Sequence, residues 1–293
     1  MVMEGRIIQG RGGLYTVRDA AGTDHVLRAK NRFRHEGITP LVGDLVKFTP
    51  GQLEEHGWLE EILPRSSISV RPPVANITQL IITLAVEPVP DLLLLDKLLL
   101  FALEQDLAVV LAVNKSDLDL SLAQRLASAY RQTGIPVLAV SAVEGQGMED
   151  LRQLMAGHIN CFAGQSGVGK STLIASLTGL DLVIGDISQK IRRGRQTTRH
   201  ISLLEARGLK VLDTPGFSLL ELPTQLEPAH LRELYPEFSD IQQDCRFEVC
   251  LHNKEPGCAV QAAMQEGRID SGRLERYRTL LAQQQEKWSN RYA

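Results

Sequence analysis

The chain has 293 residues, 43% of them hydrophobic and 23% charged, a composition typical of globular proteins and unlike that of disordered or fibrous ones. Its formal net charge of -3 excludes a general affinity for polyanions, so a nucleic-acid surface has to be a local patch. The most apolar run, residues 92–103, is short and interrupted by Asp96 and Lys97, and no signal peptide is visible, which predicts a cytoplasmic protein with no membrane partner. The length predicts two or three domains.

Residues 1–68 alternate short apolar runs with turns and show little helical periodicity. Five such runs predict a small β-barrel, and an OB-fold is the architecture that fits them best. The expected strands are residues 5–9, 13–17, 25–28, 43–48 and 57–62.

A basic stripe lies within this first domain, where cations recur at every second residue. On an extended segment they would share one face and suit contact with an RNA backbone. The stripe consists of Arg28, Lys30, Arg32 and Arg34. The alternative is a solvated edge strand that uses charge against aggregation. The domain as a whole holds nine basic and nine acidic residues, so the stripe alone argues for RNA.

Residues 69–225 alternate strand-like and helix-like segments, which predicts an α/β domain with a mainly parallel, helix-covered sheet. The expected strands are residues 80–86, 107–113, 135–140, 158–163 and 209–213, and the expected helices are residues 91–105, 121–133, 148–157 and 172–177. Cys161 lies in an apolar strand and is interpreted as a core thiol.

A guanine-reading motif, Asn114-Lys115-Ser116-Asp117, directly follows the strand at 107–113. The carboxylate of Asp117 can accept both the N1–H and the exocyclic amine of guanine, a donor pair that adenine lacks. Asn114 completes the motif, and Lys115 would lie along the base plane. Ser141 and Ala142 end the next strand, where a backbone N–H can meet the guanine carbonyl.

A strand, a glycine-rich loop and a helix follow one another at residues 158–177, the arrangement of a phosphate-binding loop. The glycines let successive backbone N–H groups turn toward phosphates. Lys170 would reach the β- and γ-phosphates, and the Ser171 hydroxyl would ligate Mg²⁺. The expected nucleotide-binding residues here are Gly164, Gln165, Ser166, Gly167, Val168, Gly169, Lys170, Ser171 and Thr172.

The third nucleotide element is the strand that ends in Asp213-Thr-Pro-Gly216. Asp213 would hold Mg²⁺ through water, and the N–H of Gly216 would sense the γ-phosphate. Before it lies Gly194-Arg-Gln-Thr-Thr198, in the position of the first switch, where Thr198, or else Thr197, would ligate Mg²⁺. The guanine motif precedes the phosphate loop, the reverse of ordinary GTPases, so the sequence predicts a circularly permuted GTPase.

The region from residue 226 onward is polar and helical and holds three cysteines and a histidine within fourteen residues. Three thiolates and one imidazole form a closed tetrahedral set, typical of structural zinc. The set is Cys245, Cys250, His252 and Cys258. Unrelated core cysteines are the alternative. Residues 270–288 predict a terminal amphipathic helix.

Taken together, these motifs resemble those of the bacterial circularly permuted GTPases that depend on the small ribosomal subunit, the RsgA or YjeQ family, over essentially the full chain. The resemblance implies an OB-fold at residues 1–68, a permuted GTPase domain at 69–225 and a helical zinc domain at 226–293. It further implies an assembly factor that binds the small subunit and its rRNA, with GTP hydrolysis stimulated by the subunit. We expect Mg²⁺ with GTP, one zinc ion and a monomer.

The first switch departs from the family pattern Gly-x-His-Thr-Thr-Thr, because Gln196 and Arg199 replace the His and the third Thr. Phe217 stands where Ras-like GTPases have their water-orienting Gln, and a phenyl ring cannot orient water. Gln196, which has both a donor and an acceptor, is therefore expected to act in catalysis with Thr198 and Lys170. Alternatively, Gln196 is a solvated loop residue and backbone groups or rRNA place the water.

Five cations lie within residues 190–199, so rRNA phosphates are expected to order this loop, and the isolated protein is expected to hydrolyse GTP slowly. A solvated loop without a role is the alternative. A second class of function also fits the sequence: an RNA-binding or metallochaperone module in which bound nucleotide is mainly structural.

Overall fold

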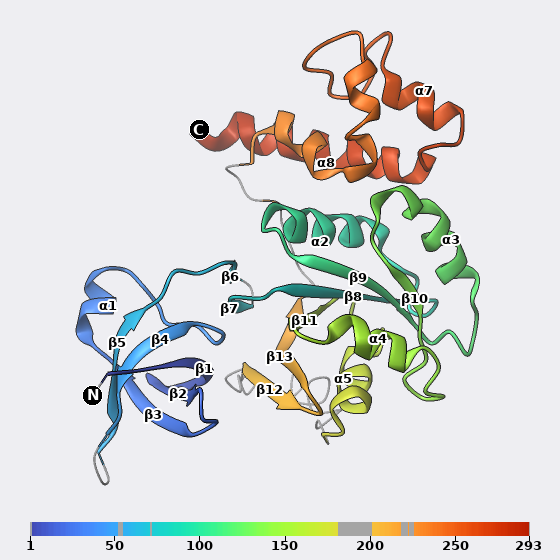
Figure 1. Ribbon diagram of the computed structural model, residues 1–293. Coiled ribbons are helices and arrows are strands. Elements are labelled where there is room, and N and C mark those ends of the chain that lie inside the picture. The colour runs from blue at the N-terminus through green and yellow to red at the C-terminus, as the bar shows by residue number, and fades with distance from the viewer. Residues whose placement is uncertain are drawn as a thin grey trace, which may run out of the picture. The chain divides into compact units, whose positions relative to one another are not determined.

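The computed structural model describes residues 2–51, 55–70, 72–180, 201–217, 222 and 226–292, with the backbone alone at residues 34, 214–217 and 292. The spatial proximity of Cα atoms divides the chain into two compact units. The first contains residues 1–81, 148–163 and 169–217, and the second contains residues 82–147, 164–168 and 218–293. Figure 1 shows the elements of both units along the chain.

Five strands of the first unit close into a barrel, coloured blue in Figure 1: β1 (Met3–Arg11), β2 (Leu14–Asp19), β3 (Asp24–Ala29), β4 (Leu45–Thr49) and β5 (Gly57–Ile62). β1 pairs with β2 and β4, β2 with β3, β3 in parallel with β5, and β5 with β4. Alternate side chains fill the interior, so that Ile7, Val17, Leu27, Phe48 and Leu59 are fully buried. The expected five-stranded, OB-like barrel is confirmed.

The basic stripe is not one extended face, and that structural expectation is wrong. β3 ends at Ala29, and the helix α1 (Asn31–His35) follows. The backbone N–H of Phe33 donates to the carbonyl of Lys30 at 3.2 Å, which turns the chain. The helix buries the Phe33 ring, which is 4% exposed. A helical segment does not place every second side chain on one face, so the cations do not form a stripe.

The first unit continues as a sheet beyond the barrel through β12 (Ser202–Ala206), β13 (Leu209–Phe217) and β11 (Ile159–Ala163). β1 meets β12 at Gln9 and Ser202, β12 is antiparallel to β13, and β13 is parallel to β11. Helices α4 (Met148–Met155) and α5 (Lys170–Thr178) belong to the same unit, as does the small hairpin of β6 (Ile68–Val70) and β7 (Pro73–Ala75). Of these strands, β6, β7 and β12 were not predicted.

The second unit contains the parallel pair β9 (Ala108–Asn114) and β10 (Val137–Ala139), and β9 also neighbours β8 (Gln79–Ala85). Every residue of β8 is buried, as the unbroken apolar run predicts for a helix-covered strand. α2 (Leu92–Glu104) packs against β9, and α3 (Ser121–Ala129), followed by the short helix η1 (Arg131–Thr133), packs against β10. The expected strand and helix alternation is confirmed.

The carboxyl-terminal part of the second unit is helical. The short helices η2 (Pro228–Leu234), η3 (Pro236–Phe238) and η4 (Ile241–Asp244) precede α7 (Ala259–Gln265), α8 (Ser271–Ser289) and η5 (Asn290–Tyr292). Tyr235, Phe238 and Tyr277 form the centre of its core. Asp270 caps α8 by accepting the N–H of Arg273 at 2.8 Å. No helix in the described parts of the chain is long and apolar enough to cross a membrane.

Candidate nucleotide and metal sites

Asn114, the last residue of β9, ties together three segments of the second unit. Its side chain is 3% exposed, its Nδ2 donates to the carbonyl of Val168 at 2.9 Å, and its Oδ1 accepts the N–H of Ala142 at 3.2 Å. The guanine motif, the phosphate loop and the end of β10 are therefore held side by side, as the sequence predicted from the carboxyl ends of parallel strands.

Lys115 adopts a left-handed backbone conformation, with φ of 61°, and its side chain crosses to the phosphate loop. The ammonium donates to the carbonyls of Glu87 at 2.7 Å and Gly167 at 3.0 Å. These bonds support the strained backbone and fix the side chain. Asp117 is exposed beside it, and nothing within the described ranges hydrogen-bonds to or pairs with its carboxylate. That carboxylate remains available to a ligand.

Ser141 and Ala142 lie where the motif places them, but protein acceptors already use both backbone N–H groups. Ser141 donates to the carbonyl of Gln146 at 2.9 Å, and Ala142 donates to Asn114 at 3.2 Å. The longer bond is the weaker one, so Ala142 is the N–H for which a guanine carbonyl can compete. The Ser141 hydroxyl accepts the N–H of Glu144 at 3.1 Å and shapes the turn.

The phosphate loop requires glycine at its first position, because a Cβ on Gly164 would lie 2.2 Å from the carbonyl oxygen of Thr83 and φ there is 131°. Gly169 has φ of 92° and immediately precedes α5, which begins at Lys170. Val168 is 1% exposed and anchors the loop, whereas Ser166 and Gly167 are exposed. Ser171 and Thr172 lie in the first turn of α5.

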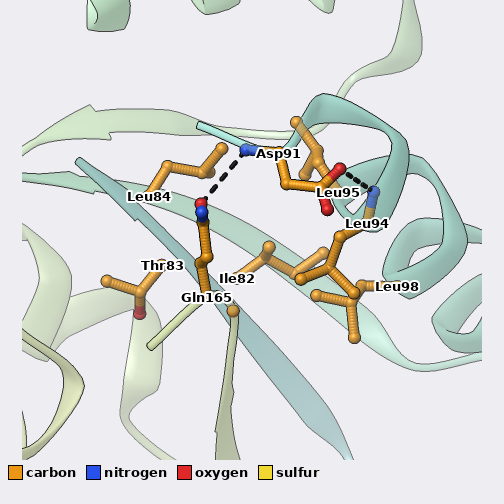
Figure 2. Close-up of a pocket in the computed structure, with 9 residues that line it drawn as sticks. Ile82, Thr83, Leu84, Asp91, Leu94, Leu95, Leu98 and Gln165 are labelled. Carbon is orange, nitrogen blue, oxygen red and sulfur yellow. Dashed lines mark hydrogen bonds between the residues drawn. The ribbon is translucent and has the colours of Figure 1, made fainter. Parts of the chain in front are cut away.

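Gln165 of the phosphate loop reaches the start of α2, where its Oε1 accepts the backbone N–H of Asp91 at 3.1 Å (Figure 2). A cavity of about 10 Å³ lies between this contact and the apolar residues of α2 and β8. A space of that size holds at most about one water molecule. The hydrogen bond between Gln165 and Asp91 supports the loop, and the cavity is too small for a nucleotide.

Two charged groups of the first unit, Lys170 at the start of α5 and Asp213 in β13, are partly buried. Burial lowers the pKa of Lys170 to about 8, and burial raises the pKa of Asp213. Each shift arises because the charged form loses hydration on burial. A phosphate would offset this loss for the ammonium of Lys170, and a Mg²⁺ ion would offset it for the carboxylate of Asp213. Gly216 lies within β13. Gln196, Thr197, Thr198 and the cations at 190–199 lie outside the described residues.

The four predicted zinc ligands come together in the second unit, with their ligand atoms all within 4.8 Å of one another. The Nδ1 of His252 is 3.4 Å from the sulfur of Cys258 and 3.7 Å from that of Cys245. Burial lowers the pKa of His252 to about 4 and raises that of the Cys250 thiol to about 12. The imidazole is therefore neutral, and the thiolate state requires a cation, so the donor set fits a tetrahedral metal ion.

A carboxylate and a guanidinium hold the backbone of this metal site. Glu255 accepts the N–H groups of Leu251 at 2.9 Å and Asn253 at 2.8 Å. Arg232 donates to the carbonyl of Cys250 at 3.1 Å. Sequence reasoning used Glu255 solely as part of a spacer and assigned no role to Arg232, because both act through backbone contacts that a ligand pattern does not reveal.

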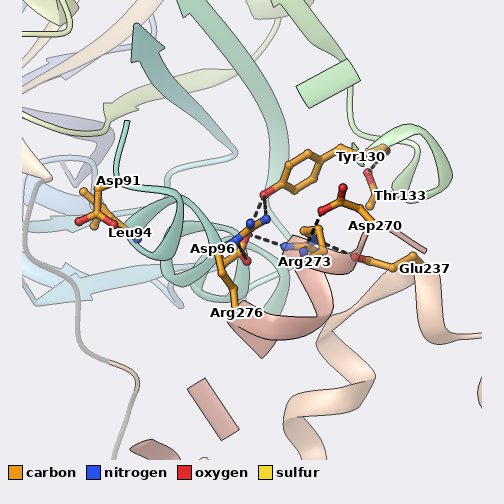
Figure 3. Close-up of polar contacts among 9 residues, drawn as sticks. All are labelled: Asp91, Leu94, Asp96, Tyr130, Thr133, Glu237, Asp270, Arg273 and Arg276. Atoms are coloured by element: carbon orange, nitrogen blue, oxygen red, sulfur yellow. Dashed lines mark hydrogen bonds and ion pairs between the residues drawn. The ribbon is translucent and has the colours of Figure 1, made fainter. Parts of the chain in front are cut away.

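A buried cluster that the sequence did not predict joins α2 and α3 to α8 (Figure 3). The guanidinium of Arg273 is 2% exposed and pairs with Asp96 at 2.6 Å and Glu237 at 2.7 Å. It lies between the rings of Tyr130 and Tyr235, 4.6 and 4.5 Å from their centroids. Arg276 pairs with the other oxygen of Asp96 at 2.7 Å. The charged Asp96 that interrupts an apolar run was the one available signal.

The cations of the barrel take separate positions. Arg28 is exposed on β3, Lys30 pairs with Glu60, and Arg32 lies on α1 with its guanidinium 5.2 Å from the Phe33 ring centroid. For Arg34 the structure describes the backbone in α1. The four residues thus lie in β3 and in the segment that follows it, without sharing a strand face.

Comparisons with known proteins cover nearly the whole chain. Two family models match it, the RsgA N-terminal domain at residues 4–59 and the RsgA GTPase at residues 62–223. A protein of Caldanaerobacter subterraneus named small ribosomal subunit biogenesis GTPase RsgA is 42% identical over 296 residues, 99% of this chain and 98% of that protein. A protein of the same name in Ruminiclostridium cellulolyticum is 43% identical, covering 93% of this chain and 91% of that protein.

Solved structures match over the same extent. The crystal structure of YjeQ from Thermotoga maritima is 32% identical with a TM-score of 0.83, covering 97% of this chain and 99% of that chain. The structure of YloQ, described as a circularly permuted GTPase, is 31% identical with a TM-score of 0.80 and coverage of 98% and 96%. The permuted order of motifs, the barrel and the cysteine and histidine cluster agree with these matches, and the chain belongs to the RsgA family of circularly permuted GTPases.

Proposed function

We propose that this protein is a GTPase that acts in biogenesis of the small ribosomal subunit, binds the subunit's rRNA and hydrolyses GTP faster on the subunit. The observation that carries the proposal is the identity of about 40% over nearly the full chain with relatives named small ribosomal subunit biogenesis GTPase. The arrangement of Asn114, Lys115 and the exposed Asp117 beside the phosphate loop supports guanine as the base.

The proposed nucleotide site combines three sets of residues. Guanine is read by Asn114, Lys115, Asp117, Ser141 and Ala142, and the phosphates are held by residues 164–172. Mg²⁺ takes Ser171, Thr198 and Asp213, and Gly216 senses the γ-phosphate. The proposed domains are residues 1–68, 69–225 and 226–293, in a monomer that works in the cytoplasm.

Zinc is the proposed ion of the cysteine and histidine cluster, because borderline-soft metals prefer thiolate and imidazole ligands in a tetrahedron. Four protein ligands leave no position for water, so the ion has a structural role. Its chemistry is to keep the thiolates of Cys245, Cys250 and Cys258 deprotonated and to fix the chain around them.

The decisive experiment measures steady-state GTP hydrolysis by the purified full chain alone, with small subunits and with large subunits. We expect a slow rate alone, stimulation by small subunits only, and a steep loss of stimulation with added salt, since docking neutralises phosphates with Lys and Arg. Absence of stimulation by small subunits at low salt contradicts the proposal. Metal transfer to a client protein, without turnover, would favour the metallochaperone module instead.

Gln196 is the proposed water-orienting residue, together with Thr198 and Lys170. Gln196→Ala should lose the stimulated rate while nucleotide affinity remains, because removing an interaction made only in the transition state lowers kcat and kcat/KM together. Gln189→Ala, a change of the same chemistry in the same segment, is the matched control. Equal stimulation of the Gln196→Ala protein and the wild type removes Gln196 from the mechanism.

A further inference from the structure

Trp58 is a large aromatic side chain on the outer surface of the barrel, 45% exposed. Its strand neighbours Gly57 and Leu59 are buried, so the alternation of β5 directs the indole outward. Across the sheet its register partners are Arg28 of β3 and Thr49 of β4. A flat apolar ring therefore lies between a cation and a hydroxyl, on three adjacent strands of the same face.

The indole borders an open depression of about 500 Å³, whose other lining residues are Lys30, Asn31, Thr49 and Glu60. This volume falls within the range of roughly 300–1,000 Å³ that small organic ligands occupy. The lining combines one aromatic wall with polar groups of both donor and acceptor type. Such a combination matches a heterocycle that stacks on its face and hydrogen-bonds along its edge.

The polar side of the depression is fixed in place. Lys30 and the Thr49 hydroxyl both donate to the carboxylate of Glu60, the latter at 3.0 Å. The hydrogen bond from Lys30 is the main cause that lowers the pKa of Glu60, and the charge of Arg32 adds to it. Glu60 therefore stays ionised and held, and its charge is compensated by cations from the end of β3 and from α1.

The charge beside the ring favours a polyanion. Arg28 is exposed, and across the described ranges no carboxylate pairs with it. Because Lys30 and Arg32 already offset Glu60, the guanidinium of Arg28 is surplus positive charge next to the indole. A phosphate attached to a stacked base can lie beside that guanidinium, whereas a neutral peptide gains nothing from its charge.

We propose that Trp58 is the platform on which one unpaired base of single-stranded RNA stacks, with Arg28 beside its phosphate and Asn31 and Thr49 at the edge of the base. The inference rests on the proposed function, in which the barrel binds rRNA, and it names the part of the RNA that the barrel takes. Stacking on an aromatic ring tolerates any base, because every base has a π-face.

The test measures binding of the full chain to two probes, a short single-stranded oligouridylate and an RNA duplex of equal length. The protein carries Trp288→Phe, so that Trp58 is the sole tryptophan. We expect the oligouridylate to quench the indole fluorescence and to bind about 5- to 150-fold more weakly to Trp58→Ala, since that is the factor that a stacked base contributes. The duplex should show neither effect.

Two further variants separate stacking from folding and from general hydrophobic contact. Trp58→Phe, which keeps an aromatic face, should retain most of the affinity, whereas Trp58→Leu should lose it. Leu45→Ala removes an exposed apolar side chain of the same barrel, 37% exposed on β4, and should change nothing. Equal affinity in the Phe and Leu variants overturns the stacking proposal.

The remaining outcomes distinguish this inference from the proposed function. If Arg28→Gln weakens oligouridylate binding and Trp58→Ala does not, the barrel binds RNA without stacking and the inference is wrong. If Trp58→Ala loses small subunits but keeps oligouridylate, Trp58 contacts a ribosomal protein and the inference is wrong. Stimulation by small subunits in the Trp288→Phe protein reports on the proposed function independently of both results.

Discussion

Replacing Arg273 with methionine should destabilise the carboxyl-terminal part of the second unit strongly. Methionine is unbranched and apolar but shorter, so the change removes the charge and also leaves a space between the rings of Tyr130 and Tyr235. The guanidinium is 2% exposed and pairs with Asp96 and Glu237, whose side chains are 0% and 4% exposed. Removing one partner of a buried ion pair costs about 3–5 kcal/mol, because the remaining charges lose their compensation. Arg276 still pairs with Asp96, so the main loss falls on Glu237.

The expected shift can be read from a tryptophan within the affected helix. In a Trp58→Phe background, Trp288 of α8 is the sole tryptophan and follows unfolding of that region. At roughly 2–4 °C for each kcal/mol, the midpoint should fall by roughly 6–20 °C. Arg268→Met, which removes an exposed ion pair with Glu266, is the control and should cost less than about 1 kcal/mol.

Two results would refute the reasoning about Arg273. The first is a midpoint shift of Arg273→Met that equals the shift of the exposed control. The second comes from a double-mutant cycle with Asp96→Asn, where groups in direct contact should show a coupling of about 1–3 kcal/mol. Strict additivity of the two single changes would mean that the 2.6 Å ion pair contributes nothing specific.

Three other predictions follow from the nucleotide and metal sites. Asp117→Asn should weaken GTP binding and favour xanthosine triphosphate, whose ring reverses the donor pattern; unchanged GTP affinity in a competition assay contradicts the assignment. GTP affinity should fall about tenfold between pH 7 and pH 9, because the ammonium of Lys170 binds phosphate and burial lowers its pKa to about 8, while Lys170→Arg should remove this slope in calorimetry. Chelation should remove one zinc ion per chain and unfold the tail, at a cost on the order of 10 kcal/mol, while leaving nucleotide binding intact; elemental analysis without stoichiometric metal contradicts it.

The sequence predicted those parts of the fold and the sites that depend on short stretches of chain. Asn114 and Lys115 follow their strand directly, and the phosphate loop is one continuous segment between β11 and α5. The four cysteine and histidine ligands lie within fourteen residues. In each case the spacing along the chain limits how far apart the side chains can lie, so a sequence motif is enough to predict that they come together.

Contacts between distant residues were the part that the sequence left open. The Arg273 ion pairs span 177 residues to Asp96 and 36 residues to Glu237, and no local periodicity links them. β12 has too irregular a pattern to indicate a strand, and it exists because β13 and β1 supply its hydrogen bonds. The basic stripe failed for the opposite reason, since a strictly local alternation was outweighed by the burial of one ring, Phe33.

Helix α2 is where the phosphate loop and the carboxyl-terminal helix of the second unit act on the same element. Its N-cap residue Asp91 is bonded to Gln165, and Asp96 pairs with both Arg273 and Arg276 (Figures 2 and 3). At 1.5 Å per residue these two attachments are about 7.5 Å apart along the axis, a distance over which an α-helix is rigid. A displacement of the phosphate loop that moves α2 must therefore either move α8 as well or break the ion pairs of Asp96 with Arg273 and Arg276. Because the ion pair of Arg273 with Asp96 is buried, moving α8 together with α2 is the less costly response.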